Sequence, residues 1–261
     1  MTPLISTSAL IGSVEVAPDH LANLTHHQVF GYLVGGSDTT ATTLAWFCKY
    51  IADNPRVQSK LRAALREAHV EAVAERRNPS VLEITKTTVP YLDAVVEETL
   101  RLAGTAPIVG RDAIVDTTIL GYPIPKGTLV LFMTKGPGVA LPPITGGLDE
   151  SQRSASSRAT KGEWNPHDVE LYRPERWIVT NPETGEAEFN AAAGPMMAFG
   201  GGPRGCFGQR LANLELRIVV TMLLWTFEFL QVTDELNSYE GMDTITTVPK
   251  MANVKLQKAQ W

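Results

Sequence analysis

A ten-residue loop, Phe199–Gly208, constrains this chain more than any other segment, because five glycines in it surround a single cysteine, Cys206. Glycine allows positive φ angles and a close approach of the backbone to a flat ligand. The apolar pattern that starts at Gln209 predicts a helix, so Cys206 lies just before a helix N-terminus, where N–H groups and the helix dipole stabilise a thiolate. A loop cysteine of this kind suits an axial thiolate ligand of haem iron.

The spacing within this loop is specific. Five of its residues fit the pattern F-x-x-G-x-R-x-C-x-G, namely Phe199, Gly202, Arg204, Cys206 and Gly208. The loop therefore resembles the cysteine signature of the cytochrome P450 family. A glycine-rich turn around a buried structural cysteine is the alternative interpretation, and it would be favoured if the motif stood alone. Three further motifs in the order of the same family favour the resemblance.

Composition limits the other function classes. The chain has 261 residues, a net charge of −5 and two cysteines, Cys48 and Cys206. This charge gives no reason to expect a nucleic-acid partner, and two cysteines cannot build a disulfide scaffold. Cys48 lies in an apolar helical run, which indicates a small buried hydrophobic residue.

Helix signals dominate the first part of the chain. A capping box at Thr25–Gln28 predicts a helix start. Pro55 and Pro90 fit first helical positions, and Gly104 fits a helix end. The predicted helices are Thr25 to about Asn54, Pro55 to about His69, and Tyr91 to about Ala103.

Short β-rich runs follow these helices. Between Ile114 and Met133, glycines and prolines divide the sequence into a hairpin and a strand. The segment Thr134–Gly162 is rich in Gly, Pro and Ser, which predicts a long surface loop. We expect a helix from the cysteine loop to about Phe229 and terminal strands over Thr244–Leu256. The predicted fold class is therefore mainly α with a small β portion.

The first predicted helix carries the segment Gly35-Gly-Ser-Asp-Thr-Thr40, whose two adjacent glycines each cost about 1 kcal/mol in a helix interior. Gly35 and Thr39 share one face, a groove with almost no side chains that ends in a hydroxyl. The segment resembles the oxygen-binding helix of P450 enzymes. This resemblance implies that Asp38 and Thr39 form a catalytic acid–alcohol pair that delivers protons. A packing site for another helix is the alternative interpretation.

Glu98 and Arg101 lie three residues apart and can pair on one helix face. The alternative interpretation is an exposed ion pair worth under about 1 kcal/mol. In P450 enzymes such a pair binds an arginine from a Pro-Glu-Arg-aromatic segment, which Pro174–Trp177 supplies here. The resemblance thus implies a structural cluster of Glu98, Arg101 and Arg176 that holds the cysteine loop against the core.

The resemblance also implies a haem-binding set, with Cys206 as the iron ligand. Arg204 and Arg111 are expected to face the haem propionates, because arginine binds carboxylates strongly. An ordinary strand arginine is the alternative for Arg111. The remaining expected cofactor contacts are Phe199, Gly202 and Gly35.

The implied fold is the C-terminal part of the cytochrome P450 fold, with a partial haem domain over residues 25–261 after a poorly defined segment of residues 1–24. The implied function is a haem-thiolate monooxygenase that inserts one oxygen atom from O2 into a lipophilic small molecule. NADPH would supply electrons through NADPH–cytochrome P450 reductase. The sequence resembles fungal secondary-metabolism members of the family.

Two alternative functions remain open. Members of the family are longer, which favours a truncated, non-catalytic fragment. A P450-like haem enzyme that catalyses rearrangement or dehydration without O2 is the other alternative, and the acid–alcohol pair argues against it. The family resembles enzymes of the endoplasmic-reticulum membrane that face the cytoplasm. Because no window reaches the roughly 18 apolar residues that span a bilayer, we expect a cytoplasmic chain without an anchor.

Overall fold

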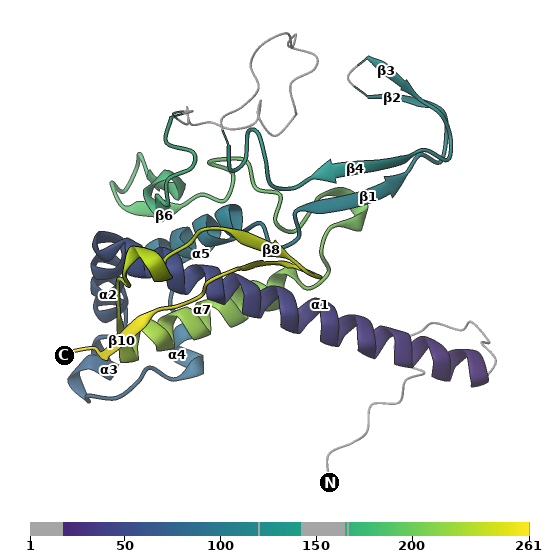
Figure 1. Cartoon of the computed structure of the whole chain (residues 1–261). Helices are drawn as coiled ribbons and strands as arrows, with labels where there is room; N and C mark the ends of the chain where they lie inside the picture. Colours follow the sequence, from purple (N-terminus) through teal and green to yellow (C-terminus); the bar gives the residue numbers. More distant parts are fainter. Residues whose placement is uncertain (1–17, 120, 142–164, 166, 261) are drawn as a thin grey trace. The chain divides into compact units, whose positions relative to one another are not determined.

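The computed structural model describes residues 18–119, 121–141, 165 and 167–260. The chain divides into two units, residues 1–38 and residues 39–261. The described part of the first unit is the beginning of a long helix, α1 (Pro18–Asp53), whose remainder belongs to the second unit. Figure 1 shows α1 as an unbroken helix. The domain boundary between residues 24 and 25 stays a prediction.

The second unit holds the other described elements. Its further helices are α2 (Pro55–Ala68), α3 (Val70–Ala74), α4 (Val81–Lys86), α5 (Pro90–Ala103) and α7 (Gln209–Thr226). Its strands are β1 (Ile108–Asp112), β2 (Thr117–Ile119), β3 (Tyr122–Ile124), β4 (Leu129–Met133), β5 (Ile178–Thr180), β6 (Ala187–Phe189), β7 (Phe227–Leu230), β8 (Gly241–Asp243), β9 (Thr247–Pro249) and β10 (Lys255–Lys258). The short 3-10 turns are η3 (Pro174–Trp177), η4 (Gly202–Arg204) and η5 (Asp234–Leu236).

The strands form only small sheets among the described residues. Each sheet has two antiparallel strands, and the pairs are β1–β4, β2–β3, β5–β6, β7–β10 and β8–β9. Helices therefore carry most of the ordered backbone. The prediction of a mainly α fold with a small β portion is confirmed.

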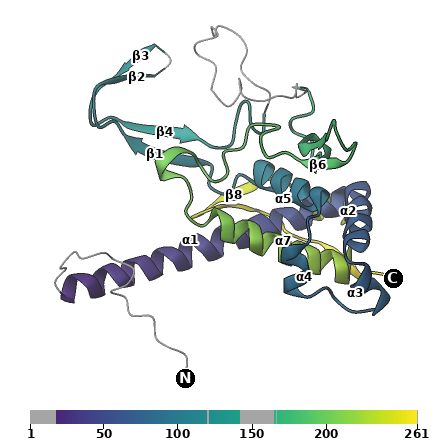
Figure 2. The ribbon, with the colours of Figure 1, turned by 180° about the vertical axis from the view of Figure 1, so that it is seen from behind.

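Helix α5 lies at the centre of the second unit. Nearly all of its side chains are buried, including the ionisable pair Glu98 and Arg101. Such burial on all sides is typical of a helix inside a core. Elements α2, α7, η3 and β6 all contact it, and Figure 2 shows α7 beside α4 from behind. The packing places η3, and the chain that follows it, directly against α5.

Local chemistry explains the ends of α2 and α5. Pro55 and Pro90 are their first helical residues, a position where proline loses no hydrogen bond. Gly104 ends α5 with a φ of +52°. A Cβ at Gly104 would lie 2.4 Å from the side chain of Lys135, so both the backbone angle and the close approach require glycine. These predicted boundaries are confirmed.

Two other predicted boundaries are wrong. Helix α1 begins at Pro18 instead of Thr25, because no glycine or further proline interrupts the helix between them and Pro18 is itself a favoured first residue. Helix α7 ends at Thr226, and the next four residues form β7. In β7, Phe229 pairs with Leu256 of β10, so a distant strand satisfies the backbone of this aromatic segment.

Two predictions concern segments that the structure covers only in part. Most of the predicted surface loop over Thr134–Gly162 lies outside the described residues. Among the described helices, none has both the length and the hydropathy that crossing a membrane requires.

Candidate functional site

The cysteine loop folds back on itself and presents its thiol outward. The backbone N–H of Cys206 donates to the carbonyl of Phe199 over 2.8 Å, and Gly205 donates to Gly202 over 3.0 Å. Gly200 and Gly202 have φ angles of +65° and +68°, which glycine adopts readily. Cys206 is exposed, three residues before the start of α7. The loop therefore displays a single accessible thiol next to a helix N-terminus, as predicted from the glycine spacing.

The two aromatic residues of this loop behave differently. Phe199 is partly buried and packs against the main core cluster, so it anchors the start of the loop. Phe207 is 88% exposed. An apolar side chain this exposed beside an accessible thiol indicates a surface that can receive an apolar ligand.

Arg111 and Arg204 meet at the cysteine loop. Arg111 lies on β1, and its Nη2 donates to the backbone carbonyl of Arg204 over 3.4 Å. Its Nη1 donates to the carbonyl of Gly110 over 2.7 Å. Arg204 is exposed on η4. Two guanidinium groups from distant parts of the sequence thus lie on one side of the loop, where they can bind carboxylates.

Glu98 is the centre of a buried charge cluster. Both of its oxygens accept from Arg101, at 2.8 Å each, and Oε1 also accepts from Nε of Arg176 over 3.0 Å. The side chains of Glu98 and Arg101 are 0% exposed, and that of Arg176 is 5% exposed. The structure therefore brings these three predicted residues together in one buried ion-pair network.

Further residues complete this network, and sequence reasoning missed them. Nε1 of Trp177 donates to Glu98 Oε2 over 2.8 Å, and the backbone N–H of Arg173 donates to Oε1 over 2.9 Å. Asp168 accepts from Arg176 over 3.2 Å and also from Arg173. Burial would raise the pKa of Asp168, but hydrogen bonds from Arg176 and Arg173 outweigh it and lower the pKa. Only the aromatic position of the Pro174–Trp177 segment gave a sequence signal for this set.

The network also positions the chain that leads to the cysteine loop. Trp177 is fully buried and clusters with Ala94 of α5 and with Ala193. Met196 packs partly against the same cluster, and Phe199 packs against the main core. The contacts therefore continue from α5 through η3 to the first residue of the cysteine loop.

The acid–alcohol pair lies on α1, where Asp38 ends the first unit and Thr39 begins the second. Both residues are of intermediate exposure. Thr43 Oγ1 donates to the backbone carbonyl of Thr39 over 2.9 Å. A Cβ at Gly35 would meet no atom within 4 Å among the described residues. The described contacts join Arg111 to the cysteine loop, and they do not join Thr39 to Cys206.

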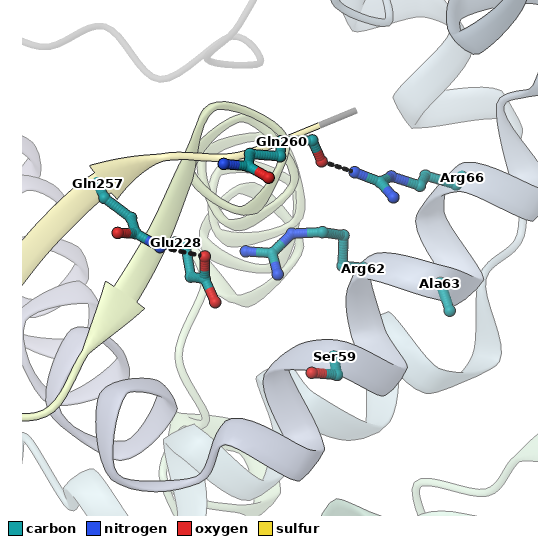
Figure 3. A pocket seen from close by; sticks show the side chains of 7 residues that line it. All are labelled: Ser59, Arg62, Ala63, Arg66, Glu228, Gln257 and Gln260. Atoms are coloured by element: carbon teal, nitrogen blue, oxygen red, sulfur yellow. Dashed lines mark hydrogen bonds between the residues drawn. The ribbon is translucent and has the colours of Figure 1, made fainter.

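An open polar pocket of about 370 Å³ lies elsewhere in the second unit. Figure 3 shows Arg62 and Arg66 of α2 beside Glu228 of β7 and Gln257 of β10. Nε of Arg62 donates to the carbonyl of Leu224, and its Nη2 donates to Phe227 and Gln58. The chain's own carbonyl groups therefore engage much of this guanidinium, and none of the predicted site residues lines the pocket.

Comparison with known proteins decides between the interpretations of these motifs. A model of the family Cytochrome P450 matches residues 20–136 and 163–256. The chain belongs to the cytochrome P450 family. Both matched ranges together contain every predicted site residue, from Gly35 on α1 to Cys206. The match leaves out residues 137–162.

Relatives from fungi support this assignment. The chain is 41% identical to "Cytochrome P450 monooxygenase TRI13" of Fusarium sporotrichioides, over 98% of this chain and 46% of that protein. It is 41% identical to "Hps1-dma1 cluster cytochrome P450 monooxygenase cyp3.1" of Dothistroma septosporum, over 92% of this chain and 80% of that protein. It is 43% identical to "Cytochrome P450 monooxygenase xilC" of Penicillium rubens, over 82% of this chain and 36% of that protein. The chain thus spans less than half of two of these P450 relatives and four fifths of the third.

Proposed function

We propose that this chain carries the haem-thiolate centre of a monooxygenase that inserts one oxygen atom from O2 into a lipophilic small molecule of fungal secondary metabolism. The observation that carries the proposal is the exposed thiol of Cys206 on a glycine loop beside Arg204 and Arg111. The names of the relatives support it, since they are P450 monooxygenases and one is assigned to a gene cluster.

The donor set of this site fits haem. Haem offers one metal ion, two propionates and a flat apolar ring, and the loop region offers one thiol, two guanidinium groups and accessible apolar side chains. Phe207 of the loop is 88% exposed, and Leu131 and Met133 of β4, the strand paired with β1, are 59% and 60% exposed. Cys206 would hold the iron, while Arg204 and Arg111 would bind the propionates.

The remaining site residues have supporting roles. Bound haem would supply the activation of O2, which thiolate ligation favours. Glycine at positions 200 and 202 permits the loop angles that direct the thiol outward. Glu98, Arg101 and Arg176 hold η3 against α5. Thr39 would hold a proton on Oγ1, and Asp38 would exchange that proton with solvent.

Electrons and substrate have to come from outside this chain. We propose that NADPH supplies electrons through a NADPH–cytochrome P450 reductase, as the family assignment implies. The exposed apolar residues at the site favour a lipophilic substrate. The presence of Asp38 and Thr39 argues against a family member that rearranges or dehydrates its substrate without O2.

A non-catalytic fragment is the second candidate function. The coverage of less than half of two relatives favours it. Against it stands the relative named a monooxygenase of which this chain covers 80%. Both candidates contain the same cysteine loop, so only haem binding and turnover separate them.

The deciding experiment is the CO-difference spectrum of the purified chain after haem loading and reduction. We expect the Soret band typical of a CO adduct with thiolate-ligated haem. A chain with no haem absorbance would support the fragment. A CO adduct without the thiolate band would contradict the role of Cys206.

Thr39→Ala is expected to uncouple the reaction without removing haem. Thr39 is no iron ligand, so the CO-difference spectrum should stay unchanged, whereas the hydroxyl proton is lost and electrons from NADPH leave as hydrogen peroxide. The measurement is the ratio of product formed to NADPH oxidised in the chain reconstituted with its reductase. Thr39→Ser, which keeps the hydroxyl, should restore the ratio. Equal ratios in Thr39→Ala and wild type would mean that Thr39 acts only in packing.

A further inference from the structure

Three aromatic side chains stack in a row from the core of the second unit to its surface. The ring centroids of Trp46 and Tyr50 on α1 are 5.9 Å apart, with the planes inclined by 22°. Those of Tyr50 and Tyr239 are 5.6 Å apart, with the planes inclined by 26°. Trp46 is 2% exposed, Tyr50 is 7% exposed and Tyr239 is 47% exposed. Electrons pass readily between rings this close, so the row connects a buried indole to a phenol in contact with solvent.

The outer ring is equipped to lose a proton together with an electron. The hydroxyl of Tyr239 donates to Asp53 Oδ2 over 2.6 Å. Burial, followed by the neighbouring Asp53, raises the pKa of Tyr239, so the phenol keeps its proton until the ring is oxidised. Lys49 Nζ lies 4.7 Å from the centroid of the same ring. Because this cation disfavours a positively charged ring, oxidation of Tyr239 has to transfer the phenolic proton to Asp53 and leave a neutral radical.

The inner ring has no such acceptor. Nε1 of Trp46 donates over 2.9 Å to the carbonyl of Thr247, and a carbonyl does not take up that proton. Lys135 Nζ lies 5.5 Å from the Trp46 ring, which again disfavours positive charge there. Trp46 follows Thr39 by seven residues on α1, which is about 10 Å along the axis and close to two full turns. An oxidised Trp46 is therefore less stable than an oxidised Tyr239.

We propose that Trp46, Tyr50 and Tyr239 form a relay that carries surplus oxidising equivalents from the haem side of α1 to the surface. The inference rests on the proposed haem function. An oxidising equivalent at the haem takes one electron from Trp46, which takes one from Tyr50, which takes one from Tyr239. The phenolic proton of Tyr239 moves to Asp53. A small reductant in solvent, such as ascorbate or a thiol, then returns an electron to Tyr239, and Asp53 returns the proton.

Packing alone does not require these features. Phenylalanine at position 239 would stack on Tyr50 equally well, so the hydrogen bond to Asp53 serves something else. A fourth ring makes the contrast clear. Tyr172 stacks on Tyr50 at 4.9 Å, but it is only 8% exposed and its hydroxyl bonds to Thr99. Tyr172 thus has neither a carboxylate nor access to a reductant, and the relay runs through Tyr239.

The two cysteines allow a test that needs no haem. Cys206 is exposed, whereas Cys48 is partly buried and burial raises the pKa of its thiol to about 11. A thiol-reactive ruthenium polypyridyl complex should therefore label Cys206 selectively, and it places a photo-oxidant where haem would bind. After flash oxidation with an external electron acceptor, a nitroso spin trap and mass spectrometry identify the residue that carries the radical.

We expect the trapped radical on Tyr239 in the wild-type chain, and a several-fold lower yield in Trp46→Phe, Tyr50→Phe and Asp53→Asn. Tyr122→Phe is the matched control, because Tyr122 is 73% exposed on β3 and lies outside the row. Thermal unfolding identifies any variant that has lost its fold, and Tyr50→Phe keeps the stacked ring. Equal yields on Tyr239 in wild type, Trp46→Phe and Tyr50→Phe would overturn the relay.

A haem-loaded chain supplies the second measurement. With hydrogen peroxide and no substrate, Tyr239→Phe should lose its haem absorbance several-fold faster than Tyr122→Phe, because oxidising equivalents then stay at the haem. Equal rates of bleaching would contradict the protective role. Failure of the proposed function appears separately as a missing CO-difference band, since the photo-oxidation experiment does not depend on haem.

Discussion

Replacing Glu98 with alanine is expected to lower the free energy of unfolding by about 3–5 kcal/mol, the usual cost of removing one partner from a buried ion-pair network. Arg101 is 0% exposed and Arg176 is 5% exposed, so neither guanidinium could be solvated in place of the carboxylate. Nε1 of Trp177 would also lose its acceptor. Urea unfolding followed by far-UV circular dichroism measures the effect.

An exposed ion pair provides the matched control. Lys250 and Glu240 lie 2.8 Å apart, with side chains 54% and 64% exposed, so Glu240→Ala should cost no more than about 1 kcal/mol. Glu98→Gln keeps the shape of the side chain and one acceptor oxygen, and it should cost less than Glu98→Ala. A loss below about 1 kcal/mol for Glu98→Ala would mean that the buried charges contribute no more than surface charges.

A double-mutant cycle tests whether the cluster acts as one unit. Arg176 also donates to Asp168, so Arg176→Ala alone leaves both Glu98 and Asp168 with fewer partners. The effects of Glu98→Ala and Arg176→Ala should therefore sum to more than the effect of the double variant. Additive effects would indicate separate interactions.

Local signals explain which parts of the fold the sequence predicted. Proline at the start of α2 and α5 and glycine after α5 act within one helical turn, and the structure confirms those boundaries. The cysteine loop also depends on local glycine geometry, and its exposed thiol lies where the spacing indicated. The end of α7 depends instead on β10, a strand close to the C-terminus. No local pattern contains that partner, which is why the sequence extended the helix through Phe229.

The charge cluster shows the same limit at the level of side chains. The spacing of Glu98 and Arg101 predicted their pairing, and a family resemblance was needed to add Arg176. Asp168 and the backbone N–H of Arg173 joined only in the structure. Hydrogen bonds to the backbone and partners distant in sequence leave no spacing rule to follow. Sequence reasoning therefore identified the residue types of the site better than their full set of contacts.

Replacing Cys206 with alanine is expected to abolish thiolate-type haem binding while leaving the fold intact. Cys206 is exposed, and its side chain makes no described hydrogen bond, so the free energy of unfolding should change by no more than about 0.5 kcal/mol. The iron, however, would lose its only protein ligand at this loop. The measurement is the CO-difference spectrum of the reduced, haem-loaded chain, with thermal unfolding recorded on the same sample.

Cys48→Ala is the matched control, and it should give the reverse pattern. Cys48 packs partly against the core, so removing its sulfur should cost about 1 kcal/mol without changing the spectrum. The less stable variant would then keep the thiolate band, and the more stable variant would lose it. General damage to the fold cannot produce that order, because it would affect both properties together. An unchanged thiolate band in Cys206→Ala would show that the iron ligand lies elsewhere.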